Sequence, residues 1–538
     1  MVFLSIVTFY FNRILDFVKK LSSGISPSSR WETMKGRNDR NLKLILVSLF
    51  TALSLLSLFS FPATFDEAAF LQVPKNLIRY NQYATATLEG FDTFNPAVST
   101  GPAVLLPIAL VFKLFGIGLL QARFVMLAFF IGTIAALYSL AKYLFDGKVA
   151  LLCLFLLICN TNNDFVYTLG TTVHGEVPAI FFFTVGCLYW FRSFHTQEGS
   201  NRYLLLSGLF WAMAILSKHL FLFLIIALVL IYCLSILFEG KMRFRQIAFP
   251  LVVIGCFLFL WILWQISVLG FRETIIKIGG LSRFQAKITG SSLEVPFRNL
   301  TNIEQWIGWG LIIPSILYAV YLMVRQGAQS VAIGFILLFM HLWILWWLLG
   351  NTTGWFRHVF PGMVFMNIFI SKFLIDIYRM VRTEKKIKTD AEVAAAPSAP
   401  LLYSMISVMI VTLVLGRTLI PTGLYSFKLG DYAGKRQRQE EFARYIREEI
   451  EQEAIVSGYG WYMEWPISFL ADRMFRNRKS LPPEHRDSVP EYLIITPNMK
   501  SKGLAKDLKE FVNEHTTPYH RIDGYEIYKV REKVESGE

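Results

Sequence analysis

The sequence predicts an all-α polytopic membrane protein with a small α/β domain at its C-terminal end. The 538 residues are 54% hydrophobic and only 17% charged, whereas a soluble domain carries about 25% charged residues. One membrane-spanning helix needs about 20 predominantly apolar residues, and runs of that kind recur along the chain. The C-terminal residues break this pattern, because helical and strand-like segments alternate there.

The net charge of +14 does not indicate a nucleic-acid partner. Basic residues lie in short hydrophilic stretches between apolar runs, which is the positive-inside distribution rather than a phosphate-binding face. The five cysteines all lie in apolar runs without metal-ligand spacing, so we interpret them as packing residues. Membrane lipids are therefore the expected surroundings.

Residues 1–42 predict a cytoplasmic amphipathic segment, because their basic residues follow the apolar stretch and no cleavage site appears. Basic stretches at 19–43 and 381–399 set the orientation: N-terminus cytoplasmic, C-terminal domain extracytoplasmic, in the plasma (inner) membrane. A transmembrane domain over 43–420 is expected to hold about eleven helices. They are 43–61, 123–141, 148–162, 176–191, 203–217, 220–237, 247–268, 306–325, 329–349, 356–380 and 401–420.

The loop 62–122 is long and lies outside in this topology. Its apolar segment 101–118, GPAVLLPIALVFKLFGIG, contains two prolines and Lys113, which favours a helix in the outer interface over a membrane span. The tail 421–538 predicts an α/β domain. Its helical patterns cover 435–454 and 503–515, and its strand-like runs cover 454–460, 491–497 and 524–530.

Asp66 and Glu67 stand side by side where the first apolar helix ends. A carboxylate at such a place can act as a general base or hold a divalent metal. An ordinary solvated pair is the competing interpretation. The surrounding loop favours a functional role for the pair, because Phe94-Asn95-Pro96 and Ser99-Thr100-Gly101-Pro102 follow in a stretch suited to line an active site.

Further charged residues are expected on the same outer face. His174 and Glu176 precede a predicted helix, where Glu is also favoured by the helix dipole alone. Lys218 and Arg357, each followed by a histidine, are explained either as snorkelling anchors or as ligands of a phosphate at the interface. Arg123 belongs to the same group.

These motifs resemble the GT-C superfamily of polytopic glycosyltransferases. Phe65-Asp66-Glu67-Ala68, Gln121-Ala122-Arg123 and Arg357-His358-Val359-Phe360-Pro361 are most similar to the branch of protein mannosyltransferases, aminoarabinose (lipid A) transferases and bacterial galacturonosyltransferase-like proteins. The resemblance covers roughly residues 60–360. It implies transfer of a sugar from a polyprenyl-phosphate donor to a lipid, glycan or protein acceptor on the outer face of the membrane.

The resemblance also implies roles for individual residues. Asp66 would be the general base and Glu67 its support or a metal ligand. The donor phosphate would be held by Lys218, Arg357, Arg123 and His358. Where many relatives carry Asp, this chain has Glu176 preceded by His174, so a divalent metal (Mg²⁺ or Mn²⁺) is an open expectation with these two as its ligands. No other cofactor is expected, and no dinucleotide-binding glycine motif appears.

Two other functions are compatible with parts of the sequence. A transporter or lipid flippase would use Asp66 and Glu176 as ion-coupling groups, but transport sites usually lie near the bilayer midplane rather than on one face. A binding module with a membrane anchor explains the tail, yet about eleven helices exceed what anchoring needs.

Overall fold

The computed structural model describes residues 36–159, 165–195, 200–237, 242–288, 309–325, 330–350, 355–390, 428–459, 464–478, 490–497 and 506–531, together with Asn299, Tyr425 and Met499. The chain forms two compact units. The first comprises Met1–Ser57, Ser99–Val104 and Met126–Lys428, and the second comprises Leu58–Val98, Leu105–Val125 and Leu429–Glu538. The predicted helix 401–420 and the segment 1–35 lie outside the described residues.

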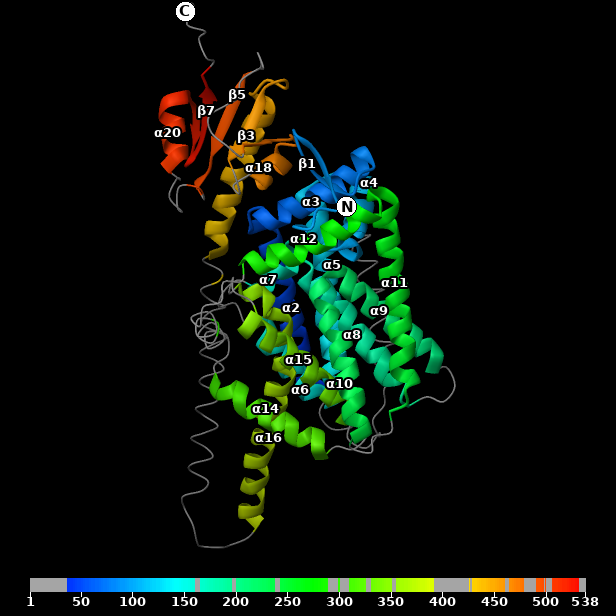
Figure 1. Ribbon diagram of the computed structural model, residues 1–538. Helices are drawn as coiled ribbons and strands as arrows, with labels where there is room; N and C mark the ends of the chain where they lie inside the picture. The colour runs from blue at the N-terminus through cyan, green and yellow to red at the C-terminus, as the bar shows by residue number, and fades with distance from the viewer. Residues whose placement is uncertain are drawn as a thin grey trace, which may run out of the picture. The chain divides into compact units, whose positions relative to one another are not determined.

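The first unit is a bundle of helices (Figure 1). Two short 3-10 turns, His219–Leu222 and Phe356–His358, precede α10 and α16. The α-helices that lie in this unit or enter it are α2 (Gly36–Ser60), α5 (Leu119–Leu144), α6 (Gly147–Ile158), α7 (Phe165–Thr171), α8 (Glu176–Arg192), α9 (Ser200–Ser217), α10 (Phe223–Leu237), α11 (Arg245–Leu269), α12 (Phe271–Ile288), α14 (Trp309–Arg325), α15 (Ser330–Gly350) and α16 (Phe360–Asp390).

Helices form at ten of the eleven predicted spans, but the number that cross a membrane is not confirmed. Among the described residues, five helices are long and apolar enough to cross, or up to six if the bent pair α2 and α3 is counted as one span. The helix α4 (Pro102–Phe115) forms where a non-spanning helix was expected. Its 14 residues extend about 21 Å, which is less than the ~30 Å hydrocarbon core.

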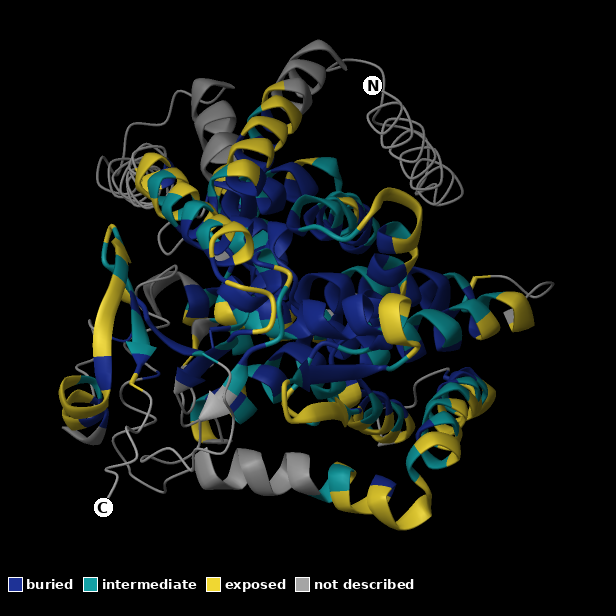
Figure 2. Cartoon of the chain, turned by 90° about the horizontal axis from the view of Figure 1, so that it is seen from above, coloured by how far each residue is buried: buried dark blue, intermediate teal, exposed yellow. Residues whose placement is uncertain are grey.

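Buried residues gather in the central helices, and many residues of the outer helices are exposed (Figure 2). Aromatic side chains pack together in the first unit. The rings of Phe183 on α8 and Phe339 on α15 stack with centroids 4.1 Å apart. Trp211 on α9 donates from Nε1 to the Phe183 carbonyl at 3.1 Å. A Cβ at Gly186 would lie 2.4 Å from the Trp211 ring, so the absence of a side chain lets α8 and α9 approach this closely.

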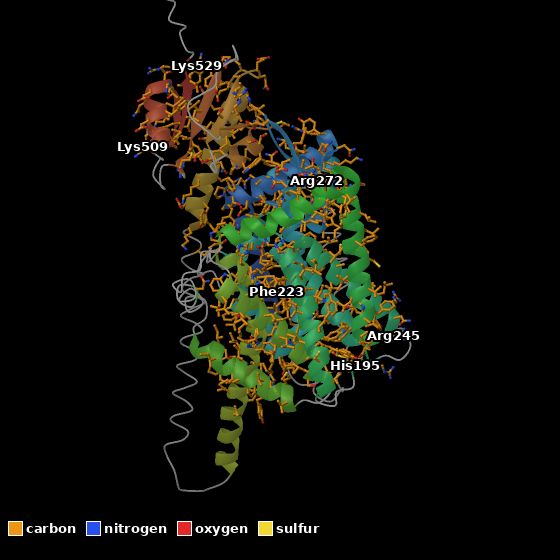
Figure 3. All side chains as sticks on the ribbon, in the orientation of Figure 1. His195, Phe223, Arg245, Arg272, Lys509 and Lys529 are labelled. Atoms are coloured by element: carbon orange, nitrogen blue, oxygen red, sulfur yellow. The ribbon has the colours of Figure 1, made fainter. Side chains whose placement is uncertain are left out.

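Charged residues mark the two ends of this unit. His195 and Arg245 lie at one end, and Arg272, just beyond α11, lies at the other (Figure 3). The 25 residues of α11 extend about 37 Å, which is enough to cross the apolar core of a bilayer.

The second unit combines much of the first loop with the tail. From the loop come α3 (Phe65–Tyr80), the hairpin β1 (Ala84–Thr87) and β2 (Gly90–Thr93), and most of α4. The tail contributes a helix over 428–448 and a five-stranded sheet of order β4-β3-β5-β7-β6. The strands are β3 (Ile455–Tyr459), β4 (Arg476–Arg478), β5 (Glu491–Ile495), β6 (Thr516–Ile522) and β7 (Tyr525–Val530), with α18 (Trp465–Leu470) and α20 (Lys506–His515) between them.

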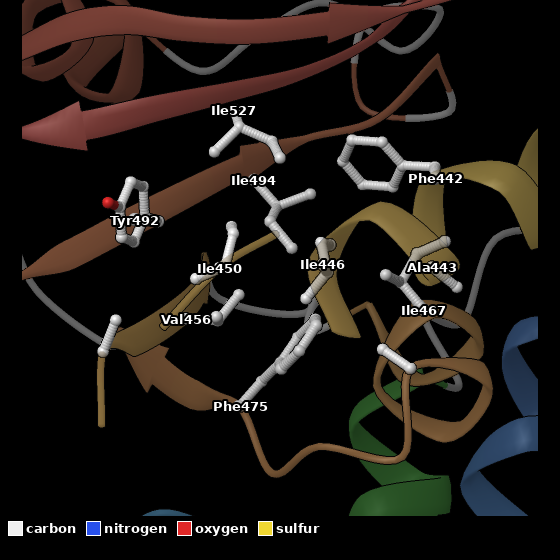
Figure 4. Close-up of a cluster of buried hydrophobic side chains, with 12 residues drawn as sticks. Phe442, Ala443, Ile446, Ile450, Val456, Ile467, Phe475, Tyr492, Ile494 and Ile527 are labelled. Atoms are coloured by element: carbon white, nitrogen blue, oxygen red, sulfur yellow. The ribbon is translucent and has the colours of Figure 1, made fainter. Parts of the chain in front are cut away.

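The central strand β5 is buried on both faces, which explains its continuous apolar sequence. Tyr492 and Ile494 point into a core formed with Phe442 and Ile446 of the 428–448 helix (Figure 4). Leu493 and Ile495 point to the opposite side, where α20 covers the sheet. β3 pairs in parallel with β4 and β5, while β7 is antiparallel to β5 and β6.

The predicted α/β character of the tail is confirmed, with strands at all three predicted runs and a helix within 503–515. The first tail helix differs from its predicted range of 435–454, since it covers 428–448. β4 and β6 were not predicted, because RNR and TTPYHRI lack an alternating apolar pattern.

Candidate active site

The two adjacent acids sit at the start of α3, which is bent by 80° from α2. Thr64 is the N-cap, and its hydroxyl accepts from the Glu67 amide at 3.3 Å. The Glu67 carboxylate accepts in return from the Thr64 amide at 3.4 Å, which completes a capping box. Asp66 is half-buried, whereas Glu67 is 0% exposed. The chain therefore places the two carboxylates in different environments.

Glu67 is held by a buried ion pair with Arg123. Arg123 donates from Nε to Glu67 Oε1 at 2.9 Å and from Nη2 to Oε2 at 2.7 Å. Both side chains are fully buried. This two-pronged geometry matches a planar guanidinium to a carboxylate, and the pairing is what allows either charge to be buried.

Arg123 also binds the backbone where α2 ends. Nη1 donates to the carbonyls of Leu58 at 3.2 Å and Phe61 at 2.7 Å, and Nη2 donates to Pro62 at 3.0 Å. With the two bonds to Glu67, these use all five N–H groups of the guanidinium. No donor of Arg123 is left for a substrate phosphate in this arrangement.

Side chains of the 428–448 helix, which belongs to the C-terminal α/β domain, also bind the turn between α2 and α3. Arg436 donates from Nη1 to the carbonyls of Leu58 at 3.1 Å and Phe59 at 2.8 Å. Gln439 bonds both backbone groups of Ala63, accepting from the amide at 2.8 Å and donating to the carbonyl at 3.1 Å. The last carbonyls of α2, which lack helical partners, are thus satisfied by side chains.

A second set of polar contacts holds the C-terminal half of α3. Asp472 accepts from Arg79 at 2.7 and 2.5 Å and pairs with Lys75 at 2.8 Å. Burial alone would raise the pKa of Asp472, but the hydrogen bonds from Arg79 and Lys75 outweigh it and hold that pKa below its ordinary value. Polar contacts therefore connect the α/β domain to both ends of α3.

A separate charged cluster lies in the first unit around Glu176. Lys218 Nζ lies 3.0 Å from Glu176 Oε1 and donates to Ser99 Oγ at 2.9 Å. Both charged side chains are nearly fully buried, at 3% and 1% exposure. α9 ends at Ser217, and Lys218 adopts an extended backbone before the 3-10 turn, so its side chain leaves the helix axis to reach these partners.

Two glycines pack closely against the backbone at the end of α9. A Cβ at Gly101 would lie 2.0 Å from the Leu216 carbonyl oxygen, and one at Gly175 would lie 2.4 Å from that of Ser217. The Gly101 amide donates to the Ser217 carbonyl at 3.0 Å. The segments that carry Ser99 and Glu176 can therefore approach Lys218 only because these positions lack side chains.

Three more predicted residues join this cluster. His174, Arg357 and His358 lie near the Glu176 carboxylate. The Arg357 guanidinium lies over the Trp355 ring, 4.3 Å from its centroid, a cation–π contact. Trp343 donates from Nε1 to the His358 carbonyl. Five of the predicted site residues are thus brought together by α8, α9 and the turn before α16.

The expected metal does not fit the side chains around Glu176. No group of three or more His, Cys, Asp or Glu residues that could hold a metal ion occurs among the described residues. Glu176 already faces the ammonium of Lys218 at 3.0 Å, and a divalent cation there would be repelled by that charge. The metal expectation is not confirmed.

Some residues of this arrangement were missed by sequence reasoning. Asp472, Arg436, Gln439 and Lys75 hold α3 in place, yet each lies in a helix or turn whose pattern suggests only a solvated surface. Their partners are up to 397 residues away, as for Lys75 and Asp472, so no local spacing could have indicated them.

Comparison with known proteins supports this description. Residues 99–264 match the family described as dolichyl-phosphate-mannose-protein mannosyltransferase. No curated protein matches the chain in sequence. The fold is similar to that of ArnT from Cupriavidus metallidurans bound to undecaprenyl phosphate, with a TM-score of 0.61, 12% identity, and coverage of 91% of this chain and 98% of that one.

The apo state of the same ArnT gives a TM-score of 0.58 with 12% identity and the same coverage. The apo oligosaccharyltransferase of Archaeoglobus fulgidus gives 0.50 with 13% identity, covering 80% of this chain and 64% of that one. The resemblance to the GT-C superfamily of membrane glycosyltransferases is thereby confirmed. The chain is a multi-pass membrane protein whose fold is similar to that of ArnT.

Asp472→Asn tests the attachment of α3 to the tail domain. The folded-state pKa of Asp472 lies below the unfolded value of about 3.9, so its stabilising contribution is fully present above pH ~4 and is lost as the pH falls through the folded pKa. At neutral pH we expect hydrogen exchange of the Phe65–Tyr80 amides to quicken about fivefold, which corresponds to ~1 kcal/mol for a partly exposed pair.

The control is Asp523→Asn, which changes an exposed turn of the same domain. The difference between Asp472→Asn and the unchanged protein should shrink in acid, after correction for intrinsic exchange rates. A difference that persists below the folded pKa, or an equal effect of Asp523→Asn, would contradict the assigned contact.

Proposed function

We propose that this protein transfers a sugar from a polyprenyl-phosphate donor to a hydroxyl of a lipid, glycan or protein acceptor at the outer face of the membrane. The observation that carries this proposal is the buried cluster in which Lys218, Arg357 and His358 gather around a single carboxylate, Glu176. The fold similarity to an ArnT solved with undecaprenyl phosphate supports the same donor class. The sugar and the acceptor are left open.

In the proposed reaction the acceptor oxygen attacks the anomeric carbon of the sugar. The bond from that carbon to the phosphate oxygen breaks, and polyprenyl phosphate leaves with the bonding electron pair. The transition state resembles an oxocarbenium ion, and negative charge develops on the phosphate. Lys218 and Arg357 are proposed to stabilise that charge, because preorganised cations in a water-poor site act strongly there.

Asp66 is proposed to take the proton from the acceptor hydroxyl. It is half-buried at the start of α3, beside the fully buried Glu67. Glu67 is proposed to act differently, because both its oxygens are bonded to Arg123. We assign Glu67 and Arg123 the task of fixing the turn that presents Asp66, and His358 that of lining the phosphate site.

Asp66→Asn is expected to lower the transfer rate by about 10²- to 10⁴-fold, the range typical of losing a general base. The substitution keeps the size of the side chain, so folding should be unchanged. The assay is transfer of labelled sugar from a polyprenyl-phosphate donor by the purified chain, with Asp92→Asn as a control on an exposed strand of the same loop. Retained transfer would exclude Asp66 as the base, and ion-driven uptake without transfer would favour a transporter.

The phosphate site is tested by neutralising its buried ion pair. In the double variant Lys218→Gln and Glu176→Gln, both members of the pair become neutral, and the donor KM should rise about 10- to 100-fold, as expected for loss of a charge-assisted hydrogen bond. The single variant Glu176→Gln keeps the cation and should leave the donor KM nearly unchanged. An equal rise in both variants would show that Lys218 does not contact the donor.

A further inference from the structure

We propose that a groove in the second unit binds the phosphate of an anionic membrane lipid. The groove has a volume of about 290 Å³ and lies between the helix at 428–448 and the beginning of α5. Its lining combines three arginines and one glutamate from the tail helix with Gln121 and three leucines from α5 and α18. This site is separate from the Glu176 cluster, and it does not depend on the transfer reaction.

The basic lining forms one face of the tail helix. Arg436, Arg444 and Arg447 line the groove together with one acid, Glu440. At 100° per residue, these four positions fall within a sector of about 80°. Arg436 pairs with Glu440 at 2.7 Å, and Arg447 pairs with the exposed Glu448 at 3.4 Å, so Arg444 supplies the guanidinium charge that no acid compensates among the described residues. Arg444 is exposed and makes no ion pair with any described residue.

The position of the groove along the membrane normal argues for a lipid rather than a free anion. Leu119 and Leu120 in its wall are the first residues of α5, one of the helices able to cross a membrane. Arg436 also contacts the carbonyls of Leu58 and Phe59, near the end of α2. The ends of apolar helices lie at the depth of the lipid headgroups, so the groove faces the layer that contains lipid phosphates.

The chemistry of the lining fits a phosphodiester that carries acyl chains. Guanidinium groups bind phosphate oxygens through paired N–H donors, and the free amides at the start of a long helix add positive potential. The leucines offer apolar contact to the glycerol and the first methylenes of the chains. A zwitterionic headgroup would bring its own cation toward the arginines, so an anionic lipid is favoured.

The test is native mass spectrometry of the full-length protein released from micelles that contain equal amounts of phosphatidylglycerol and phosphatidylcholine. The unchanged protein should retain phosphatidylglycerol selectively. In the variant Arg444→Gln and Arg447→Gln this selectivity should fall about fivefold for each charge removed, the contribution expected of one basic residue near an anionic surface. Both side chains are exposed, so the fold should persist.

The matched control is Arg438→Gln. Arg438 lies on the same helix but about 200° around it from Arg436, and it does not line the groove. Its selectivity for phosphatidylglycerol should equal that of the unchanged protein. The proposal is overturned if the unchanged protein shows no selectivity, if Arg438→Gln loses as much as the double variant, or if inorganic phosphate is retained in place of lipid. If the double variant misfolds, Arg444→Gln alone is compared with Arg438→Gln in the same way.

Discussion

The buried pair of Arg123 and Glu67 is the interaction on which the candidate site depends. The chain breaks between α2 and α3 with a bend of 80°, and such a break leaves backbone carbonyls without helical partners. Arg123 supplies donors to three of them and places its charge against Glu67. Because an unpaired buried charge would be strongly destabilising, guanidinium, carboxylate and turn form one mutually dependent structure, and Asp66 takes its position from it.

The C-terminal α/β domain also contacts this turn and α3. Arg436 and Gln439 bond the backbone of the turn, and Asp472 holds the far end of α3 through Lys75 and Arg79. The α/β domain thus has a mechanical role that its sheet alone does not suggest. Polar side chains connect it to α3, and ring contacts such as Phe61 with Tyr432 add to them.

The sequence predicted those parts of the structure that depend on local pattern. Long apolar runs indicated the helices, and alternating or continuous apolar strands indicated β3, β5 and β7. Charged residues at predicted helix ends suggested a shared site, and in the structure Glu176 forms an ion pair with Lys218. The sequence pattern could not distinguish the environments of Asp66 and Glu67. The difference arises because Glu67 pairs with Arg123, which lies 56 residues away. The close packing of Gly101 against Leu216 and of Gly175 against Ser217 likewise joins residues far apart in sequence, so no local pattern indicates it.

A double-mutant cycle between Arg123→Gln and Glu67→Gln tests the central claim most directly. Hydrogen exchange of the amides over residues 58–68 is measured in both single variants and in the double variant. If the pair holds the turn, each single change should weaken protection by about 3–5 kcal/mol, and the double change should cost little more than either alone. Losses that simply add, or protection that stays unchanged, would contradict the account.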